Sequence, residues 1–575
     1  MRTLKKILPF VGKYRRDLIL AVLFVVVESV IELFVPFVMA AVIDVGVVQR
    51  DIHFILFKGA EMVALTALSF TAGMFYAGFI ARAAYGFGAA VREAEYAAVQ
   101  QYSFGDLDNF RTSSLVTRMT SDTTVLQNAV INGVRPMIRG PVMMVLGIFL
   151  AFRMNAHLSV IFLVLLPILA VIVFTIVSRI APLYNVMQKA VDSVNTVVQE
   201  DLTAVRVIKA FVRGEYEENK FAAVNGHLRE VTEKATALTV LNQPAFQTLL
   251  YTAMVLFMWM GGNMIIKGTL KVGELTGILT YVLQIMNSVM MISNSFLLLT
   301  RSLASVERIA EILERKPEIR NPEKPVTEVK DGSVDFCDVS FKYGKNASEY
   351  TLEHVTLSFR AGQTIGIIGG TGSSKSTLVQ LIPRLYDAAE GEVKVGGRNV
   401  KDYDLKALHD AVGIVLQKNL LFSGTIEDNL KWGNEKATEA EVQNALVTAA
   451  ADRFVAGFPE GIRTELGQGG VNVSGGQKQR LCIARTVLKA PKILILDDAV
   501  SAVDTATERK IRNALSSLED MTKIIIAQRV TSVMDADSIV IMDNGTVHAV
   551  GTHAELLAKD PIYQEIWRTQ TGGKV

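Results

Sequence analysis

Cysteine is scarce in this sequence: Cys337 and Cys482 are its only two among 575 residues. Two cysteines cannot build a disulfide framework or a metal site of four cysteine ligands, so we expect both to be small, buried side chains. A basic surplus is also missing, because 59 lysines and arginines nearly balance 57 acidic residues, for a net charge of +2. A nucleic-acid-binding protein normally carries a large basic surplus, so the sequence predicts no nucleic-acid partner.

Apolar residues, by contrast, are abundant: they make up 50% of the chain, and its mean hydropathy is +0.32. They are concentrated in the N-terminal half, where we predict six segments long enough to cross roughly 30 Å of hydrocarbon. The predicted spans are 18–44, 55–85, 136–153, 157–181, 240–266 and 273–300. Residues 1–17 are basic and amphipathic without a cleavage site, which predicts a helix lying on the membrane surface.

The connections between these spans differ in length and charge. Those between spans two and three and between spans four and five are long and basic, whereas the others are short. By the positive-inside tendency the long ones are cytoplasmic. The sequence therefore predicts a multi-pass protein of the cell membrane with its N- and C-termini in the cytoplasm. Residues 184–211 keep a helical spacing without Pro or Gly, so we expect helices that continue past the membrane.

A few polar residues interrupt the apolar spans. Glu28 and Glu32 are four residues apart and therefore share one face of a helix. An ionisable side chain within a membrane usually faces an interior cavity. We expect these two, with Gln247, Gln284 and Asn287, to line an interior cavity, where an acid could contact a substrate or a coupling ion. Hydrogen bonding between helices is the alternative role.

The C-terminal region, 333–575, follows a charged, proline-containing linker at 314–332 and has a different pattern. "QTIGIIGGTGSSKSTLVQLI" indicates a strand, a glycine-rich loop and a helix, the arrangement in which backbone N–H groups surround phosphates. Lys375 would reach the outer phosphates, and the Ser376 hydroxyl would help to hold Mg²⁺. The predicted nucleotide-binding residues of this loop are Gly369, Gly370, Thr371, Gly372, Ser373, Ser374, Lys375, Ser376 and Thr377.

Further motifs follow in a fixed order. "IVLQKNLLFSGTIEDNL" contains Gln417, and "VSGGQKQRLCIARTVL" precedes a buried strand, "ILILD". That strand would place Asp497 at its C-terminal end, where a carboxylate can orient water on Mg²⁺. One such motif is weak evidence, but this order and spacing is specific.

In these motifs the chain resembles the ATP-binding cassette (ABC) transporters, in particular the half-transporters with the exporter fold. The resemblance covers essentially the whole chain and is strongest over 335–565. It implies an all-α six-helix transmembrane domain, 18–313, fused to an α/β P-loop ATP-binding cassette, and ATP hydrolysis coupled to transport. Two cassettes would hold two ATP molecules between them, each bound by one chain's phosphate loop and the other chain's signature.

The resemblance also assigns roles to single residues. Tyr343 is similar to the aromatic residue that stacks on adenine, and Gln417 joins Ser376 and Asp497 around Mg²⁺. Asp504 ends the segment that crosses the dimer interface. The signature that contacts the partner's ATP corresponds to Ser474, Gly475, Gly476 and Gln477. Segments near 112–121 and 208–217 resemble the coupling helices that dock on the cassettes.

The sequence departs from the family pattern at one ATP site. Asp498 replaces the usual glutamate that polarises water, Gln528 replaces a histidine, and Ser374 replaces the last loop glycine; Gln468 stands where glutamate is common. The signature is intact apart from Val473. We therefore expect a degenerate site on this chain and a heterodimer with a second ABC half-transporter that carries the catalytic glutamate.

Transport itself is open to more than one interpretation. The favoured one is an exporter that works by alternating access on a drug-like, lipid or peptide molecule within membrane lipid. The alternatives are an importer of a metal-chelate complex with the same fold, and a nucleotide-gated channel or regulatory subunit.

Overall fold

The computed structural model describes residues 4–344 and 347–571, apart from some side chains within helices, and divides into two compact units. Unit 1 comprises Met1–Ala98 and Thr112–Arg315. Unit 2 comprises Lys316–Val575 together with the short segment Val99–Arg111 from the helical half of the chain. Residues 316–332 of the predicted linker, 314–332, therefore belong to unit 2, and its first two residues belong to unit 1.

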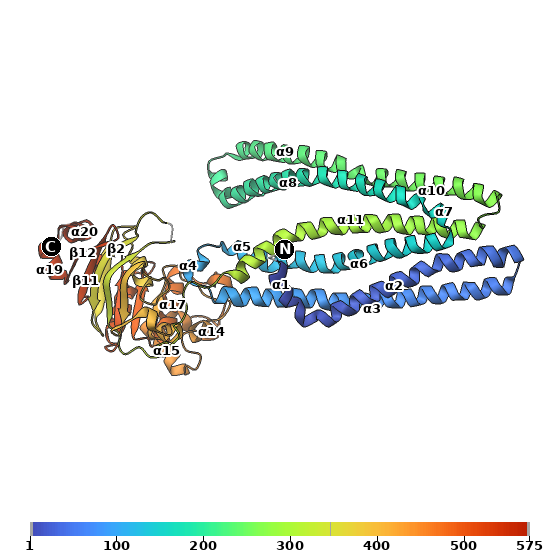
Figure 1. The fold of residues 1–575 in the computed structure, drawn as a ribbon. Coiled ribbons are helices and arrows are strands. Elements are labelled where there is room, and N and C mark those ends of the chain that lie inside the picture. Colours follow the sequence, from blue (N-terminus) through green and yellow to red (C-terminus); the bar gives the residue numbers. More distant parts are fainter. Residues whose placement is uncertain (1–3, 345–346, 572–575) are drawn as a thin grey trace. The chain divides into compact units, whose positions relative to one another are not determined.

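The described part of unit 1 is helical (Figure 1). Its helices are α1 (Leu4–Val11), α2 (Arg15–Ala41), α3 (Ile52–Gln100), α5 (Thr112–Thr117), α6 (Thr123–Met154), α7 (Ala156–Ser159), α8 (Ile161–Ala210), α9 (Gly214–Val240), α10 (Asn242–Ile266) and α11 (Val272–Glu314). Residues 1–3 of the predicted surface helix lie outside the described residues, and Ile7 of α1 is buried against α3, α6 and α11.

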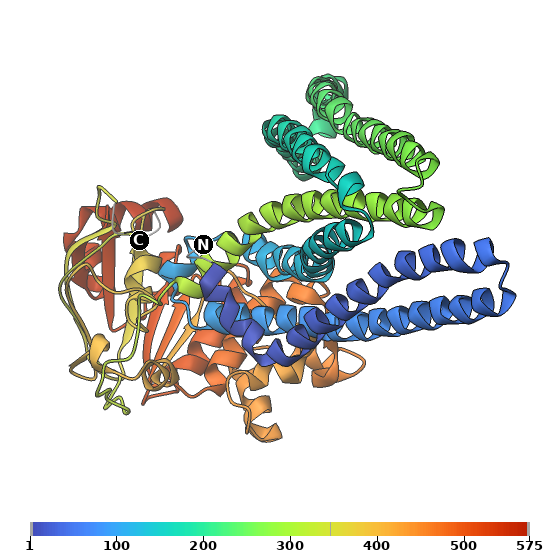
Figure 2. The same ribbon diagram turned by 45° about the vertical axis from the view of Figure 1, so that its right-hand side comes forward.

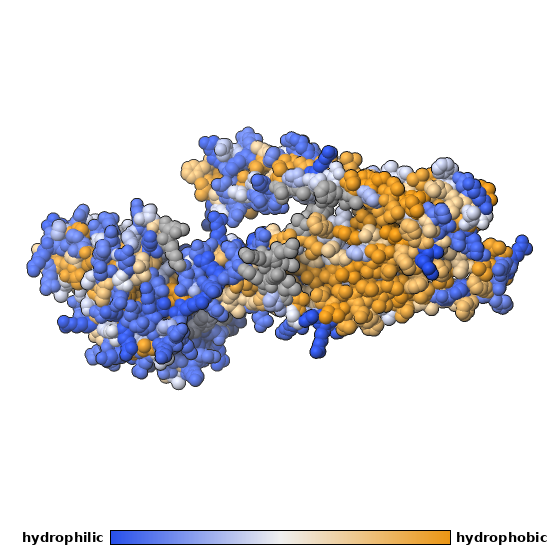
Figure 3. Space-filling view, in the orientation of Figure 1, coloured by the Kyte–Doolittle hydropathy of each residue, from blue (hydrophilic) through white to orange (hydrophobic). Residues whose placement is uncertain are grey.

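Five described helical stretches are long and apolar enough to cross a membrane: Pro9–Val47, Ile52–Gln100, Thr112–Met154, Gly214–Ile266 and Val272–Phe296. The predicted fourth span falls on α7 and α8, where the described apolar stretch is the shorter Ala156–Leu169. Six spans therefore stay a prediction. Figure 3 shows a broad apolar surface over the helices of unit 1, whereas the visible surface of unit 2 is mostly hydrophilic.

The core of unit 1 lies where α11 packs along α6 and α2 (Figures 1 and 2). Tyr281 of α11 is fully buried, and its hydroxyl donates to the Leu33 carbonyl oxygen of α2 at 2.7 Å. Gly140 and Gly147 let α6 approach α11 closely, since a Cβ at Gly140 would lie 2.5 Å from Ile292 Cγ1. The predicted all-α architecture of this region follows from that packing.

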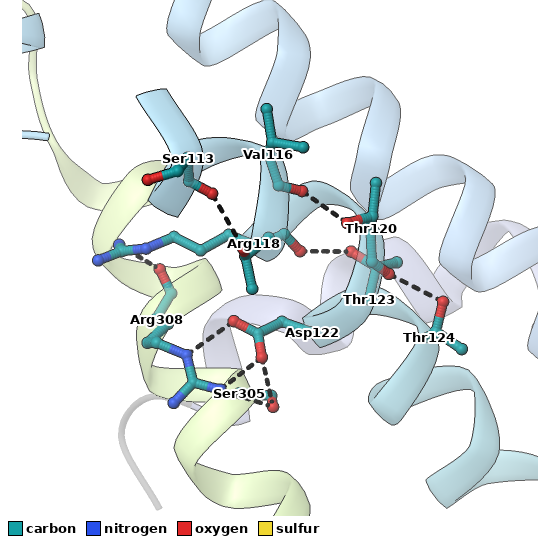
Figure 4. Close-up of polar contacts among 10 residues, drawn as sticks. Ser113, Val116, Arg118, Thr120, Asp122, Thr123, Thr124, Ser305 and Arg308 are labelled. Carbon is teal, nitrogen blue, oxygen red and sulfur yellow. Dashed lines mark hydrogen bonds and ion pairs between the residues drawn. The ribbon is translucent and has the colours of Figure 1, made fainter. Parts of the chain in front are cut away.

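A polar cluster joins the beginning of α6 to the end of α11 (Figure 4). A π-helical turn, Arg118–Asp122, directly precedes α6. Asp122, which is 3% exposed, accepts hydrogen bonds from Ser305 Oγ at 2.9 Å and Arg308 Nε at 2.7 Å. Arg118 Nη1 donates to the Arg308 carbonyl oxygen at 2.9 Å. These bonds fix the two helices to each other at this end.

Unit 2 is built around two sheets. The six-stranded sheet has the order β12-β11-β3-β10-β9-β6, in which the five strands from β11 to β6 are parallel and β12 is antiparallel. The four-stranded sheet β2-β1-β4-β5 is antiparallel. Its strands are β1 (Val334–Phe341), β2 (Leu352–Phe359), β4 (Glu390–Val395) and β5 (Arg398–Asn399); those of the six-stranded sheet are β3 (Thr364–Gly369), β6 (Val412–Val415), β9 (Ile493–Asp497), β10 (Thr522–Ile526), β11 (Ser538–Asp543) and β12 (Thr546–Gly551), and β7 (Gly424–Thr425) pairs with β8 (Glu465–Leu466).

Short helices surround these sheets and complete the predicted α/β architecture. They are α4 (Phe104–Leu107), α12 (Lys375–Gln380), α13 (Leu405–Ala411), α14 (Ile426–Lys431), α15 (Glu439–Thr448), α16 (Asp452–Ala456), α17 (Gly475–Leu488), α18 (Thr505–Ser516), α19 (His553–Lys559) and α20 (Pro561–Thr571). Cys482 on α17 is buried as predicted. The prediction was wrong for Cys337, which is exposed because β1 directs Phe336 inward and the next residue outward.

Candidate functional site

The predicted phosphate loop connects β3 to α12, at the carboxyl end of a central parallel strand. A Cβ at Gly369 would collide with the Met542 carbonyl oxygen on β11, so this position requires glycine. Lys375 Nζ donates to the carbonyl oxygens of Gly369 and Gly370, at 3.0 and 2.7 Å, and to Ser373 Oγ at 3.1 Å. Burial lowers the pKa of Lys375. The lysine therefore lies over the loop to which phosphates are expected to bind.

Ser374, just before α12, has a left-handed backbone with φ 68° and ψ 23°. Gly372 in the same loop also has a positive φ, of 85°. A side chain at a left-handed position costs on the order of 1–2 kcal/mol, whereas glycine adopts this region freely. Glycine, the usual family residue at position 374, would adopt this left-handed backbone without strain, whereas Ser374 makes the loop strained.

Asp497 and Ser376 form the predicted magnesium pair. Asp497 ends β9, whose five residues are all buried, and Ser376 Oγ donates to Asp497 Oδ1 at 2.8 Å. Burial raises the pKa of Asp497. A hydroxyl and a carboxylate are the oxygen ligands that Mg²⁺ accepts beside nucleotide phosphates, so this pair fits the ion that accompanies ATP.

Asp498 and Gln528, the two catalytic-site departures, contact each other. Gln528 Nε2 donates to Asp498 Oδ2 at 2.9 Å, and the Gln417 side chain lies close enough to the same carboxylate to favour its charged form. Asp498 has a φ of 51°, and its N–H donates to the Ile526 carbonyl oxygen of β10 at 3.2 Å. Burial raises the pKa of Asp498. The structure thus brings together the water-polarising position, the glutamine that replaces the family histidine and the glutamine expected at Mg²⁺.

Tyr343 lies just after β1 and is 43% exposed, which leaves part of its ring open to a base. Its hydroxyl is 3.0 Å from Thr377 Oγ1 of α12, and its ring meets Tyr386 edge-on at 5.3 Å. Tyr386 in turn donates to Asp108 Oδ2 at 2.7 Å and packs against Phe104 of α4. A row of aromatic rings therefore connects α4 to the nucleotide site within unit 2.

The predicted coupling segment near 112–121 lies in unit 1, whereas the preceding residues Val99–Arg111, which contain α4, group with unit 2. A coupling role for either segment stays a prediction. A local signal was present: Ser103 and Asp106 form a capping box that begins α4. The second expected coupling segment, 208–217, spans the end of α8 and the beginning of α9 in unit 1.

The signature residues begin helix α17. Ser474 Oγ accepts a hydrogen bond from the Gln477 N–H at 3.3 Å, and Gln477 Oε1 accepts from the Ser474 N–H at 2.8 Å, which forms a capping box. A Cβ at Gly476 would lie 2.8 Å from the Ala502 carbonyl oxygen, so glycine allows the close approach of the segment after Asp498. The preceding residue, Gly475, is less crowded, because a Cβ there would lie 4.0 Å from its nearest neighbour, the Ala502 Cβ.

Asp504, the predicted interface residue, caps α18 by accepting from the Thr507 N–H at 3.0 Å. Hydrogen bonds from Thr507 lower the pKa of Asp504. Gln479, which sequence reasoning missed, lies one turn into α17. Its Oε1 accepts from the Ala502 N–H at 3.1 Å, and its Nε2 is 3.5 Å from the Asp498 carbonyl oxygen. Gln479 therefore ties the signature helix to the segment between Asp498 and Asp504.

The predicted intramembrane acids of unit 1 are paired with arginines that sequence reasoning missed. Glu28 Oε1 accepts from Arg135 and, at 3.0 Å, from Arg139, and Glu32 Oε2 accepts from Arg139 at 2.5 Å. Arg135 also lies over the Tyr76 ring, 5.4 Å from its centroid. The signal was available, because Arg135 and Arg139 share the i, i+4 spacing of the two glutamates.

The other predicted cavity residues separate into two groups. Glu32 and Gln284 line one cavity of about 580 Å³ between α2, α3 and α11. Gln247 on α10 and Asn287 on α11 are exposed, and neither lines that cavity.

Comparisons with known proteins agree with this geometry. The chain matches the ABC transporter transmembrane region over residues 18–289 and the ABC transporter family over 352–501. It is 36% identical to an uncharacterized ABC transporter ATP-binding protein of Bacillus subtilis, YfiB, over 99% of both chains, and 30% identical to the ATP-dependent lipid A-core flippase of Desulfotalea psychrophila over 83% of both. Among solved structures, a bacterial Atm1-family ABC exporter with ATP bound superimposes with a TM-score of 0.83, at 25% identity, over 97% of this chain and 98% of that one.

The family match over the helical half agrees with the spanning helices, and the match over unit 2 agrees with its phosphate loop and signature. The predicted fold class and the predicted ATPase activity coupled to transport are both confirmed. The chain belongs to the ATP-binding cassette transporters, as a half-transporter whose exporter-fold membrane domain is fused to its ATPase.

Proposed function

We propose that this chain is the regulatory half of a heterodimeric ATP-driven exporter. The observation that carries the proposal is the direct contact of Asp498 with Gln528, together with the strained backbone of Ser374, in a cassette whose signature helix keeps its glycines and its cap. The first three residues belong to this chain's own ATP site. The signature serves the site on the partner.

Each departure weakens hydrolysis for a separate reason. Asp498 has one methylene fewer than glutamate, and a displacement of about 1 Å can cost roughly a hundredfold in rate. Gln528 can donate a hydrogen bond to a phosphate but carries no positive charge. Asp498 acts on the attacking water and Gln528 on the transferred phosphate of the same ATP site, so their effects are expected to compound at that site and leave the other site unaffected.

In the assembled transporter, Tyr343, Lys375 and the loop from Gly369 to Thr377 would hold ATP. Ser376, Gln417 and Asp497 would hold Mg²⁺, which neutralises charge between the outer phosphates. ATP retained at this impaired site would keep the two cassettes in contact while hydrolysis proceeds at the other. Closure of the cassettes would open the membrane helices outward, and we propose six spans with both termini in the cytoplasm.

The transported molecule is proposed to be drug-like, lipid or peptide in nature, in line with a relative named for lipid A-core flipping. Its cavity would include Glu28, Glu32 and Gln284, with Gln247 and Asn287 as further candidates.

The proposal is tested by ATPase assays on the purified chain alone and mixed with its partner half-transporter. We expect little turnover alone and robust turnover in the mixture. In the mixture, Asp498→Asn should reduce turnover modestly, whereas replacing the partner's catalytic glutamate should abolish it. Vigorous hydrolysis by this chain alone, or complete loss with Asp498→Asn, would overturn the proposal.

A further inference from the structure

The cavity of about 580 Å³ between α2, α3 and α11 has polar groups within helices that are long enough to span a membrane. All of its lining residues lie in the candidate spans Pro9–Val47, Ile52–Gln100 and Val272–Phe296. Lipid tails offer no hydrogen bonds, so polar groups at such positions are costly unless something pairs with them. The chemistry of the lining therefore indicates what fills the cavity.

The hydroxyl groups of the lining bond to backbone carbonyl oxygens. Thr66 Oγ1 donates to the Met62 carbonyl oxygen at 2.8 Å, and Thr280 Oγ1 donates to the Thr276 carbonyl oxygen at 3.0 Å. Ser69 Oγ donates to the Glu28 carbonyl oxygen at 3.5 Å. A hydroxyl has a single proton, so once it is committed to the backbone only lone pairs remain for a ligand.

Two further acceptors face the same space. Glu32 uses Oε2 for Arg139 of α6, and the structure gives its Oε1 no hydrogen bond among the described residues. Gln284 Oε1 is buried and has no partner in the described part of the chain. Arg139 does not line the cavity, so Glu32 is the one charged side chain of the described lining.

The rest of the lining is apolar and suits a bulky body. Met39 and Met62 supply flexible thioethers, and Phe70 supplies an aromatic ring that is 69% exposed. An aromatic face attracts a cation and repels an anion, and the donors that an anion would find in the described lining are neutral: the Gln284 amide and the hydroxyl groups.

We propose that this cavity binds an amphipathic organic cation, with its positive group at Glu32 and Gln284 and its apolar body against Phe70 and the methionines. The inference rests on the proposed export function and specifies its substrate class. An anionic lipid or a phosphorylated molecule is the alternative occupant of this cavity, and the competition experiment below distinguishes the two.

The test is direct binding, without ATP, to the full chain in detergent. Ethidium, a fluorescent aromatic cation, should bind, and anilinonaphthalene sulfonate, a fluorescent aromatic anion, should not compete with it. Glu32→Gln keeps the size of the side chain and an oxygen for Arg139 but removes the charge, and it should weaken ethidium binding roughly tenfold.

Glu61→Gln is the matched control. Glu61 lies on α3 beside cavity-lining Met62, and its side chain is 38% exposed against 35% for Glu32, but it pairs with Lys58 and does not line the cavity. Ethidium binding should be unchanged in this variant. If Glu32→Gln fails to fold, Thr280→Val and Gln284→Leu should weaken binding in its place.

Equal ethidium affinity in wild type and in all cavity variants, or equal competition by the sulfonate, would overturn the inference. ATP-driven ethidium transport in vesicles containing the heterodimer then tests the export function separately. Binding that depends on Glu32 without ATP-driven transport leaves the site in place and overturns the export proposal. ATP-driven transport of other molecules, without ethidium binding that depends on Glu32, supports the export proposal and overturns the inference about this cavity.

Discussion

The strained backbone of Ser374 has a measurable consequence. The residue lies in the left-handed region with φ 68°, where a Cβ costs on the order of 1–2 kcal/mol. Ser374→Gly should relieve this strain, offset in part by about 0.4–1 kcal/mol from the greater freedom of glycine in the unfolded chain. We expect a net gain of up to about 1.6 kcal/mol, measured as a higher melting temperature of the chain in detergent.

Ser374→Ala is the control, because alanine keeps the Cβ and should not share the gain. Destabilisation by Ser374→Gly would show that the serine is held by a favourable contact of its own rather than tolerated in the loop.

His409 is predicted to make folding stability depend on pH. Its Nε2 lies 2.9 Å from the Pro383 carbonyl oxygen, and burial lowers the pKa of this histidine. Because the folded-state pKa is below the unfolded value of about 6.5, the unfolded chain takes up the proton first as pH falls, and the native state loses stability below about pH 6.5. His409→Gln keeps a donor but cannot titrate, so its melting temperature should fall less between pH 7 and pH 5.5 than that of the wild type.

The pKa of His354 is shifted in the opposite direction to that of His409, so its effect on the pH dependence of stability is also opposite. Its hydrogen bond to Asp338 raises its pKa, so its contribution is present below the unfolded pKa and is lost as pH rises through the folded value. His354→Gln should therefore make the low-pH loss larger. An unchanged pH profile in His409→Gln would contradict the assignment.

At the scale of elements, α20 holds the segment that carries Gln528. Gln570 Nε2 donates to the Gln528 carbonyl oxygen at 2.8 Å, and Gln570 Oε1 accepts from the Val530 N–H at 2.8 Å. One amide thus fixes both ends of a three-residue stretch. The helix itself is anchored by Tyr563, which is fully buried in the core of unit 2.

Gln570→Ala should therefore loosen the contact between Gln528 and Asp498. Loss of about 1 kcal/mol of hydrogen bonding corresponds to roughly fivefold faster release of ATP from this chain's site, measured with labelled nucleotide. Combined with Gln528→Ala, the effect should be less than additive, since both act through one contact. Gln564→Ala on the same helix, which removes a bond to Leu557 in α19, should leave ATP release unchanged. Additive effects would refute the connection.

Elements whose chemistry is local could be predicted from the sequence, and long-range partners could not. The phosphate loop and Asp497 follow from short motifs in which each residue has a fixed backbone role. Glu28 and Arg135 are 107 residues apart, Gln528 and Gln570 are 42 apart, and Asp108 and Tyr386 are 278 apart. No local pattern specifies such pairs, because they form only when the helices and sheets pack.

At the scale of the whole molecule, a complete ATP site needs two chains. ABC exporters work as dimers, and in this family each ATP site combines the phosphate loop of one chain with the signature of the other. Ser474 and Lys375 of one cassette are therefore expected to serve different ATP molecules. Damage to each should have a different consequence, even though both residues lie in unit 2.

In the proposed heterodimer, Ser474→Ala should lower ATP turnover at least tenfold, since it would remove a hydroxyl from the proposed competent site, where a lost transition-state hydrogen bond costs about 10²–10³ in rate. Lys375→Ala should lower nucleotide occupancy at the impaired site but reduce turnover only a few fold. Thr552→Ala is the structural control, because Thr552 caps α19 through the same kind of capping box and should cost stability alone. If Lys375→Ala abolishes turnover while Ser474→Ala preserves it, hydrolysis takes place at this chain's own phosphate loop, and the two cassettes exchange the roles assigned to them here.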